Sequence, residues 1–191
     1  MEKEVHENII LGAGPAGLQL GYFFQKEGIP HLILEKNAMS GSFFDIFPHS
    51  GELISINKKH TGSDNREFNL RHDWNSLLTE EEEGLLFTDY SDAYYPKKED
   101  MTRYLGDFAD RYCPSILYNT RVIHIMKPSE EEYYVYCLSE NRPRHFVCKK
   151  THRCHGHLQS SEFAYHCLDR KSCHPSPSCA SYLSRRKTTC R

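Results

Sequence analysis

The chain has 191 residues, with 24 Lys and Arg against 26 Asp and Glu and a net charge of −2. This length allows one well-packed core and is short for a two-domain redox enzyme. The basic residues are scattered, and no segment approaches the roughly 20 apolar residues that span a bilayer, so we expect no nucleic-acid partner and no membrane span.

The first forty residues predict a β-α-β unit. Their apolar patterns indicate a buried strand at residues 9–11, an amphipathic helix at residues 16–25 and a second strand at residues 31–34. Strands that alternate with a helix in this way are typical of a parallel sheet.

A Gly-x-Gly-x-x-Gly motif joins the first strand to the helix, at Gly12, Gly14 and Gly17. Between a strand and a helix this motif is specific for dinucleotide binding. Gly12 permits the tight turn, Gly14 lets the backbone approach a pyrophosphate, and Gly17 lets the helix and strand pack closely. Free amides and the positive end of the helix dipole then face the phosphates.

An acidic residue, Glu35, follows the second strand, 18 positions after Gly17. A carboxylate near this spacing accepts hydrogen bonds from an adenosine ribose and repels a 2′-phosphate, so the pattern favours FAD or NAD over NADP. The motif and the acid together leave FAD and NAD open, and with them an NAD-binding dehydrogenase domain.

The rest of the chain divides in two near residue 150. Residues 37–96 hold many turn residues and predict few regular elements. Residues 99–112 predict a helix, residues 116–118 a buried strand, and residues 121–126, 133–138 and 145–148 antiparallel strands. We therefore predict a folded domain over residues 1–150 and a disordered Cys/His/Ser-rich tail over residues 151–191. The tail contains no CxxC pair, so we expect no metal site.

Further motifs give the chain a resemblance to flavin-containing monooxygenases. The pair Glu35-Lys36 and the turn Gly41-Ser42-Phe43-Phe44 are similar to the blocks that complete the FAD site of this family. Residues 53–62 and 67–78 resemble a branch of FAD-dependent oxidoreductases of the endoplasmic reticulum. The likeness covers residues 7–150.

The resemblance implies an α/β fold, with a Rossmann-like FAD-binding domain built on a parallel sheet and an antiparallel β-meander. It also implies the site residues. Asn57 matches an asparagine that lies beside the flavin ring, where its amide can hydrogen-bond a hydroperoxide; a turn asparagine is the alternative. The residues expected to bind FAD are Gly12, Gly14, Pro15, Ala16, Gly17, Glu35, Lys36, Gly41, Ser42, Phe43 and Asn57.

Beyond FAD, the resemblance implies NADPH as the reductant and the lumen of the endoplasmic reticulum as the location. It implies quality-control proteins that dispose of misfolded glycoproteins as partners. The substrate stays open between a small molecule and a protein thiol or amine. Residues 1–8 are charged and polar and form no signal peptide, so the chain taken as complete would be cytoplasmic.

The NADPH site of the family needs a second glycine-rich loop. After Gly106 the only glycine is Gly156, and the strand at residues 146–150 passes into residues 151–154 without the Ala-Thr-Gly triplet that closes over FAD in the family. We therefore expect a FAD-binding domain that is truncated before the NADPH domain and inactive by itself. A non-catalytic FAD-binding or scaffold protein is the alternative.

Overall fold

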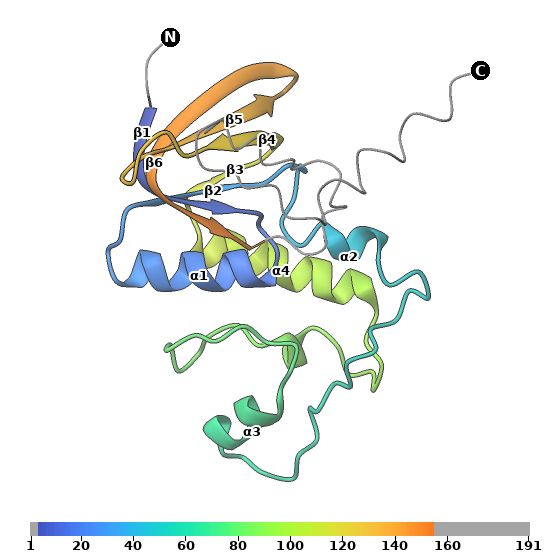
Figure 1. The fold of residues 1–191 in the computed structure, drawn as a ribbon. Coiled ribbons are helices and arrows are strands. Elements are labelled where there is room, and N and C mark those ends of the chain that lie inside the picture. Colours follow the sequence, from blue (N-terminus) through green and yellow to red (C-terminus); the bar gives the residue numbers. More distant parts are fainter. Residues whose placement is uncertain (1–3, 155–191) are drawn as a thin grey trace, which may run out of the picture.

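A computed structural model of the chain describes residues 4–154. Its strands are β1 (Glu4–Leu11), β2 (His31–Leu34), β3 (Ile116–Leu117), β4 (Thr120–Met126), β5 (Tyr133–Ser139) and β6 (Arg142–Arg153). They form one six-stranded sheet in the order β3-β2-β1-β6-β5-β4. Helices α1 (Pro15–Lys26) and α4 (Lys98–Tyr112) cover one face of this sheet, and the loop-rich segment lies beyond them (Figure 1). The predicted α/β class is confirmed.

The first three elements form the predicted β-α-β unit. β1 and β2 pair in parallel, from Asn8 opposite His31 to Leu11 opposite Leu34. Strand β1 begins five residues earlier than predicted, because its polar first half pairs with β6. Pro15 occupies the first turn of α1, where its missing N–H has no intrahelical partner to lose.

Strands β4, β5 and β6 form the predicted antiparallel meander. Glu140 and Asn141, with φ of 49° and 62°, join β5 to β6 in a two-residue hairpin turn. Strand β6 also pairs in parallel with β1, as far as Arg153, which lies opposite Leu11. The sheet therefore extends past the predicted domain limit at residue 150, because main-chain pairing with β1 holds these polar residues. The rest of the predicted tail lies outside the described residues.

One face of α4 forms the centre of the larger core cluster, as the predicted helix at residues 99–112 requires. Its buried side chains recur at helical spacing: Met101, Tyr104, Leu105, Phe108, Ala109 and Tyr112. They pack against Leu18 and Tyr22 of α1 and against Phe87 of the loop-rich segment. Complete burial of a ring such as Phe108 contributes about 1.5–3 kcal/mol.

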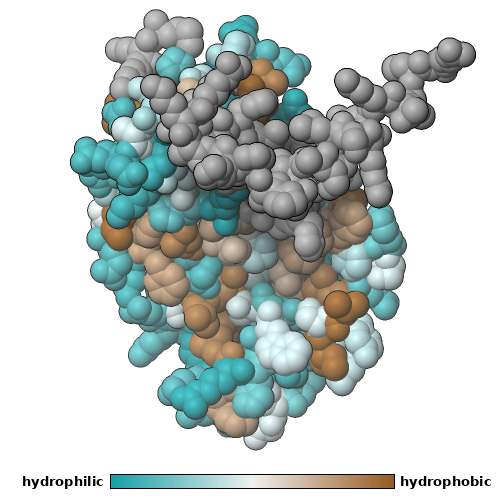
Figure 2. Space-filling view, viewed as in Figure 1, coloured by the Kyte–Doolittle hydropathy of each residue, from teal (hydrophilic) through white to brown (hydrophobic). Residues whose placement is uncertain are grey.

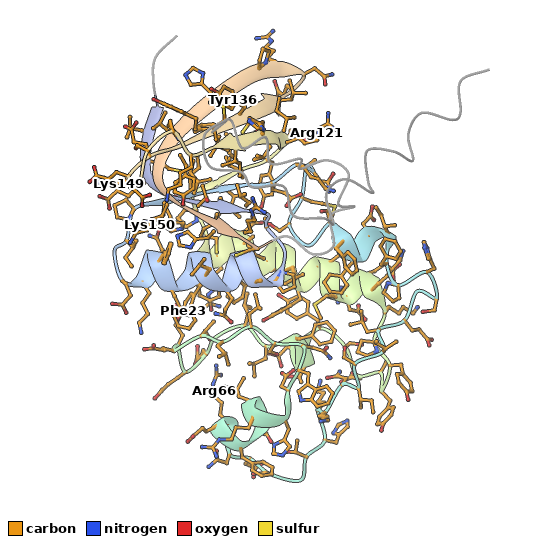
Figure 3. The ribbon with its side chains drawn as sticks, viewed as in Figure 1. Phe23, Arg66, Arg121, Tyr136, Lys149 and Lys150 are labelled. Carbon is orange, nitrogen blue, oxygen red and sulfur yellow. The ribbon has the colours of Figure 1, made fainter. Side chains whose placement is uncertain are left out.

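The loop-rich segment contains only short elements, as predicted. These are α2 (Phe43–Ile46), α3 (Arg66–His72) and the 3-10 helix η1 (Phe87–Asp89). Tyrosine hydroxyls attach the segment to both long helices: Tyr104 of α4 accepts a hydrogen bond from the Leu77 amide at 2.6 Å, and Tyr22 of α1 accepts one from the Glu80 amide at 2.8 Å. Phe23 of α1 points toward the same segment (Figure 3).

The surface is not uniformly polar. Apolar residues gather across the middle of the face shown in Figure 2, with hydrophilic residues to their lower left. Ile54 and Trp74, both in the loop-rich segment, are 92% and 73% exposed. Across residues 4–154, no helix is long and apolar enough to cross a membrane.

Candidate functional site

The glycine motif forms the turn between β1 and α1. Gly12 has a φ of 98°, in the region that favours glycine, and its amide donates to the Leu34 carbonyl at 2.8 Å. Gly14 is the N-cap residue of α1 in an extended conformation, and because it is glycine no side chain caps the helix. The amides of the first turn of a helix have no intrahelical acceptor, so this turn presents donors and a positive partial charge to a ligand.

Two glycines of the motif have opposite surroundings. A Cβ added to Gly17 would lie 1.9 Å from the Gly12 carbonyl oxygen, so only glycine allows this close approach of helix and turn. A Cβ added to Gly14 would meet no atom of residues 4–154 within 4 Å. The fold therefore requires Gly17 for packing, whereas it leaves open space beside Gly14.

Glu35 holds the glycine turn in place. Its side chain is 5% exposed, and Oε2 accepts a hydrogen bond from the Ala13 amide at 2.8 Å. Oε1 accepts one from the Asn37 amide at 2.9 Å and a longer one from the Ser42 hydroxyl at 3.4 Å. A carboxylate has about four lone-pair positions, so these three bonds leave capacity for one ligand hydroxyl.

The segment after Glu35 closes on the glycine turn from the other side. The Gly41 amide donates to the Ala13 carbonyl at 2.9 Å, and the Asn37 amide side chain donates to the Ser42 hydroxyl at 2.7 Å. Gly41 has a φ of 65°, and a Cβ there would lie 2.7 Å from a Leu105 methyl group. Ser42 therefore links this turn to the carboxylate that supports the glycine motif.

The structure brings most of the predicted site residues together at the carboxyl ends of β1 and β2. The glycine turn, Glu35, Gly41 and Ser42 are joined by the hydrogen bonds above. Lys36 and Phe43 are both exposed. The Phe43 ring stacks on Phe47, with the ring centroids 5.3 Å apart. Sequence reasoning missed the roles of Ala13 and Asn37, because their bonds to Glu35 come from main-chain amides, which carry no residue-type signal.

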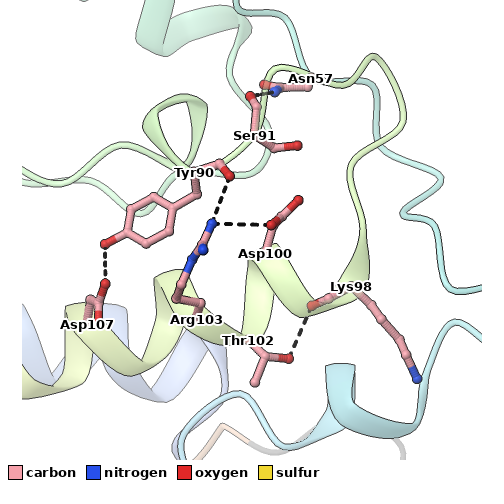
Figure 4. A network of polar contacts seen from close by, with 8 residues as sticks. All are labelled: Asn57, Tyr90, Ser91, Lys98, Asp100, Thr102, Arg103 and Asp107. Carbon is pink, nitrogen blue, oxygen red and sulfur yellow. Dashed lines mark hydrogen bonds and ion pairs between the residues drawn. The ribbon is translucent and has the colours of Figure 1, made fainter.

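Asn57 belongs to a different part of the fold. Its main-chain amide donates to the Tyr94 carbonyl at 2.9 Å. Its side-chain Nδ2 donates to the Ser91 carbonyl at 2.7 Å (Figure 4). A carbonyl only accepts, so Nδ2 must face Ser91 and the other atom is Oδ1. Oδ1 is buried and has no hydrogen-bond partner among residues 4–154. The side chain therefore has an acceptor without a partner, beside the one Nδ2 hydrogen that Ser91 does not use.

Helix α4 anchors the segment that holds Asn57. Arg103 donates to the Tyr90 carbonyl at 3.0 Å, and the Tyr90 hydroxyl donates to Asp107 at 2.7 Å (Figure 4). Burial and this bond to Asp107 raise the pKa of Tyr90, so its hydroxyl stays a donor. Residues 90 and 91 are thus fixed to a long, well-packed helix.

Comparisons with known proteins agree with this geometry. The sequence profile of a family described as pyridine nucleotide-disulphide oxidoreductase matches residues 9–145. FAD-dependent oxidoreductase domain-containing protein 2 is 46% identical over 142 residues in Mus musculus and 44% identical over 144 residues in Danio rerio. These alignments cover 73% and 75% of this chain but 21% of each relative, so the chain spans about a fifth of their length.

A solved structure extends the comparison to the fold. A flavin-containing monooxygenase from Stenotrophomonas maltophilia superposes with a TM-score of 0.61 at 20% identity. The superposition covers 80% of this chain and 38% of the monooxygenase. At this identity the likeness concerns the fold alone.

Proposed function

Since the chain belongs to the pyridine nucleotide-disulphide oxidoreductase family, we propose that residues 4–154 bind FAD as part of a flavin-dependent oxidoreductase of the monooxygenase type. The open space beside Gly14 carries this proposal. It lies where the glycine turn, the positive end of the α1 dipole and the Glu35 carboxylate meet, and no atom of residues 4–154 lies within 4 Å of the position that a Gly14 Cβ would take.

The residues present fit the cofactor. First-turn amides of α1 would hold the pyrophosphate, and Glu35 would accept a hydrogen bond from the adenosine ribose with its remaining lone-pair capacity. Ser42 and Asn37 would keep that carboxylate oriented. Bound flavin would supply the redox chemistry, while the protein supplies binding and orientation.

We propose that Asn57 contacts the cofactor or the substrate where the reaction takes place. Its buried, unpartnered Oδ1 would accept a hydrogen bond from an N–H or O–H group brought by the cofactor or the substrate. One hydrogen of Nδ2 is used by the Ser91 carbonyl, which fixes the orientation of the amide. Burial makes an unpartnered acceptor costly, by about 1–3 kcal/mol, and a bound donor would relieve that cost.

Three further parts of the proposal rest on resemblance alone. NADPH would be the reductant, the protein would work in the lumen of the endoplasmic reticulum, and its partners would be quality-control proteins for misfolded glycoproteins. The resemblance of residues 53–62 and 67–78 to that branch supports this part.

The test is a titration of the purified chain with FAD and with NAD, followed by flavin fluorescence and intrinsic fluorescence. We expect saturable binding of FAD, and Gly14→Val should abolish it because the side chain fills the phosphate space. Gly106→Val is the matched control, since Gly106 lies in α4 and its added Cβ also meets nothing within 4 Å. Wild-type FAD affinity in a folded Gly14→Val variant would contradict the proposal, and binding of NAD instead would favour a dehydrogenase domain.

A further inference from the structure

Two stretches of the loop-rich segment run side by side in opposite directions, at the lower right of Figure 1. The Leu53 amide donates to the Pro96 carbonyl at 2.7 Å, and the Asn57 amide donates to the Tyr94 carbonyl at 2.9 Å. Ile54 lies on the first stretch with 92% of its surface exposed. A side chain so exposed projects from the surface and does not sit in a groove.

Exposed aromatic side chains gather beside this isoleucine. Together they form what we call the projecting patch: Ile54, Trp74, Tyr94 and Tyr95. The Ser55 hydroxyl donates to the Asn75 side chain at 2.5 Å, and this bond brings Trp74 next to the first stretch. The two tyrosine rings meet edge-on, with centroids 5.1 Å apart. Figure 2 shows apolar residues at the lower right of the molecule, over the same two stretches.

A lysine without an acidic partner lies on the projecting patch. The Lys58 ammonium is 4.0 Å from the centre of the Trp74 ring, and no carboxylate of residues 4–154 forms an ion pair with it. Its neighbour Lys59 is instead paired with Asp92 at 2.6 Å. The acidic run at residues 80–83 is held at the far ends of α1 and α4, through Lys26 and Arg111. The charge left at the patch is therefore positive.

The kind and the exposure of these side chains favour a lipid surface over a protein groove. The anchors of protein interfaces sit in well-packed pockets, whereas Ile54 projects freely. Aromatic side chains with a polar tip are typical of the boundary between lipid head groups and acyl chains. A lysine beside them can keep its stem on apolar surface while its ammonium reaches the head groups. Lys58 already lies in this way on Trp74.

We propose that the projecting patch docks on the surface of an anionic lipid bilayer. Ile54 and Trp74 enter the interface, and the Lys58 ammonium pairs with acidic head groups. This is attachment of a folded domain to a surface, which takes apolar contact together with electrostatic attraction. The proposal does not depend on FAD binding, because no side chain of the patch belongs to the residues that would hold the cofactor.

The chain carries its own reporter, because Trp74 is its only tryptophan. The full chain without FAD is titrated with vesicles of equimolar phosphatidylcholine and phosphatidylserine, while tryptophan emission and co-sedimentation are measured. We expect a saturable blue shift that follows sedimentation, and little binding to phosphatidylcholine alone. Added salt should weaken binding, since the attraction to acidic head groups is screened.

Variants at exposed positions test the two kinds of contact. Ile54→Glu should weaken vesicle binding at least about tenfold, because it removes the apolar anchor. Lys58→Gln should weaken it about fivefold, the effect of one lysine near an anionic surface. Val5→Glu is the matched control, because Val5 is 64% exposed and lies on β1, away from the patch. Its affinity should stay close to that of the wild type, since a charge far from the bilayer is screened.

Each other outcome would overturn the proposal. Sedimentation without a blue shift would place the contact on another part of the chain. Equal binding to phosphatidylcholine alone, or undiminished binding of a folded Ile54→Glu variant, would remove the role of the charge or of the patch. A blue shift that grows with protein concentration and needs no lipid would assign the patch to a second copy of the chain. If Ile54→Glu fails to fold, the wild-type emission and the Lys58→Gln affinity decide.

Discussion

At the scale of single residues, Glu35 does more than its position after β2 indicates. The spacing from the glycine motif predicted a carboxylate near a ribose, and this ligand contact stays a prediction. The structure adds that the same carboxylate holds Ala13, Asn37 and Ser42. Sequence reasoning finds the acid because its type is distinctive, but it cannot find amide donors that every residue possesses.

Replacement of Glu35 should therefore affect both stability and binding. Glu35→Ala leaves the buried Ala13 amide without an acceptor, which should lower the free energy of unfolding by about 1–3 kcal/mol and weaken FAD by a similar amount. Urea unfolding without flavin and FAD titration measure the two effects separately. Ser42→Ala is the milder control, because it removes the 3.4 Å contact to Glu35 and the bond from the Asn37 side chain but leaves the Ala13 and Asn37 amides bonded to the carboxylate. Unchanged stability in Glu35→Ala would show that the carboxylate does not support the turn.

The buried thiols give a second prediction at this scale. Burial raises the pKa of Cys113 and Cys137 to about 12 and that of Cys148 to about 11. Because only the thiolate is nucleophilic, these groups should react with iodoacetamide at pH 8 at least about a hundredfold more slowly than a free cysteine. Half-buried Cys154 should be alkylated before them. Peptide mapping by mass spectrometry, with the urea-unfolded chain as control, checks the order; early loss of Cys113 from the folded chain would contradict it.

At the scale of elements, local patterns predicted the β-α-β unit, α4 and the meander within a few residues. Their apolar side chains recur with the period of the element that they form, so the signal is local. The sequence analysis missed the start of β1 and the end of β6 for the same reason. Both segments, residues 4–8 of β1 and residues 149–153 of β6, are mostly polar. They form strand structure because β1 and β6 pair with each other, and no local pattern reveals that pairing.

This pairing predicts that the end of β6 is structural. His152 lies opposite Ile10, and its N–H faces β1, because it is two residues before the Cys154 amide that donates to the Leu11 carbonyl. His152→Pro therefore removes a ladder hydrogen bond and should destabilise the fold by about 3 kcal/mol. Thr151→Val, which changes a neighbouring side chain and no main-chain donor, should leave stability within about 1 kcal/mol. Thermal unfolding followed by circular dichroism measures both variants. Equal melting temperatures for the two would place the end of β6 outside the cooperative sheet.

At the scale of the whole molecule, the two sides of the candidate site differ in how they are built. The glycine turn, Glu35 and the turn at Gly41 are tied to the sheet and to each other by main-chain hydrogen bonds. Asn57 instead belongs to a loop-rich segment that is held by side chains of α1 and α4. The sequence motifs predicted how the first side folds better than the second, because its turns follow local patterns whereas the loops of the second depend on tertiary contacts.

This difference predicts how tightly each fragment of FAD should bind to the chain. ADP contains the adenosine and pyrophosphate that the rigid side of the site would contact, so it should compete with FAD for the chain. FMN lacks the adenosine and should compete weakly, because it reaches neither Glu35 nor the full set of loop amides. Bound ADP at 100 times its dissociation constant should stabilise the folded state by about 2.7 kcal/mol, an effect that differential scanning fluorimetry resolves. Gly14→Val should remove the ADP shift while Gly106→Val keeps it. Stabilisation by FMN but not by ADP would mean that the glycine turn is not the principal anchor, and that the flavin is held from the side of Asn57.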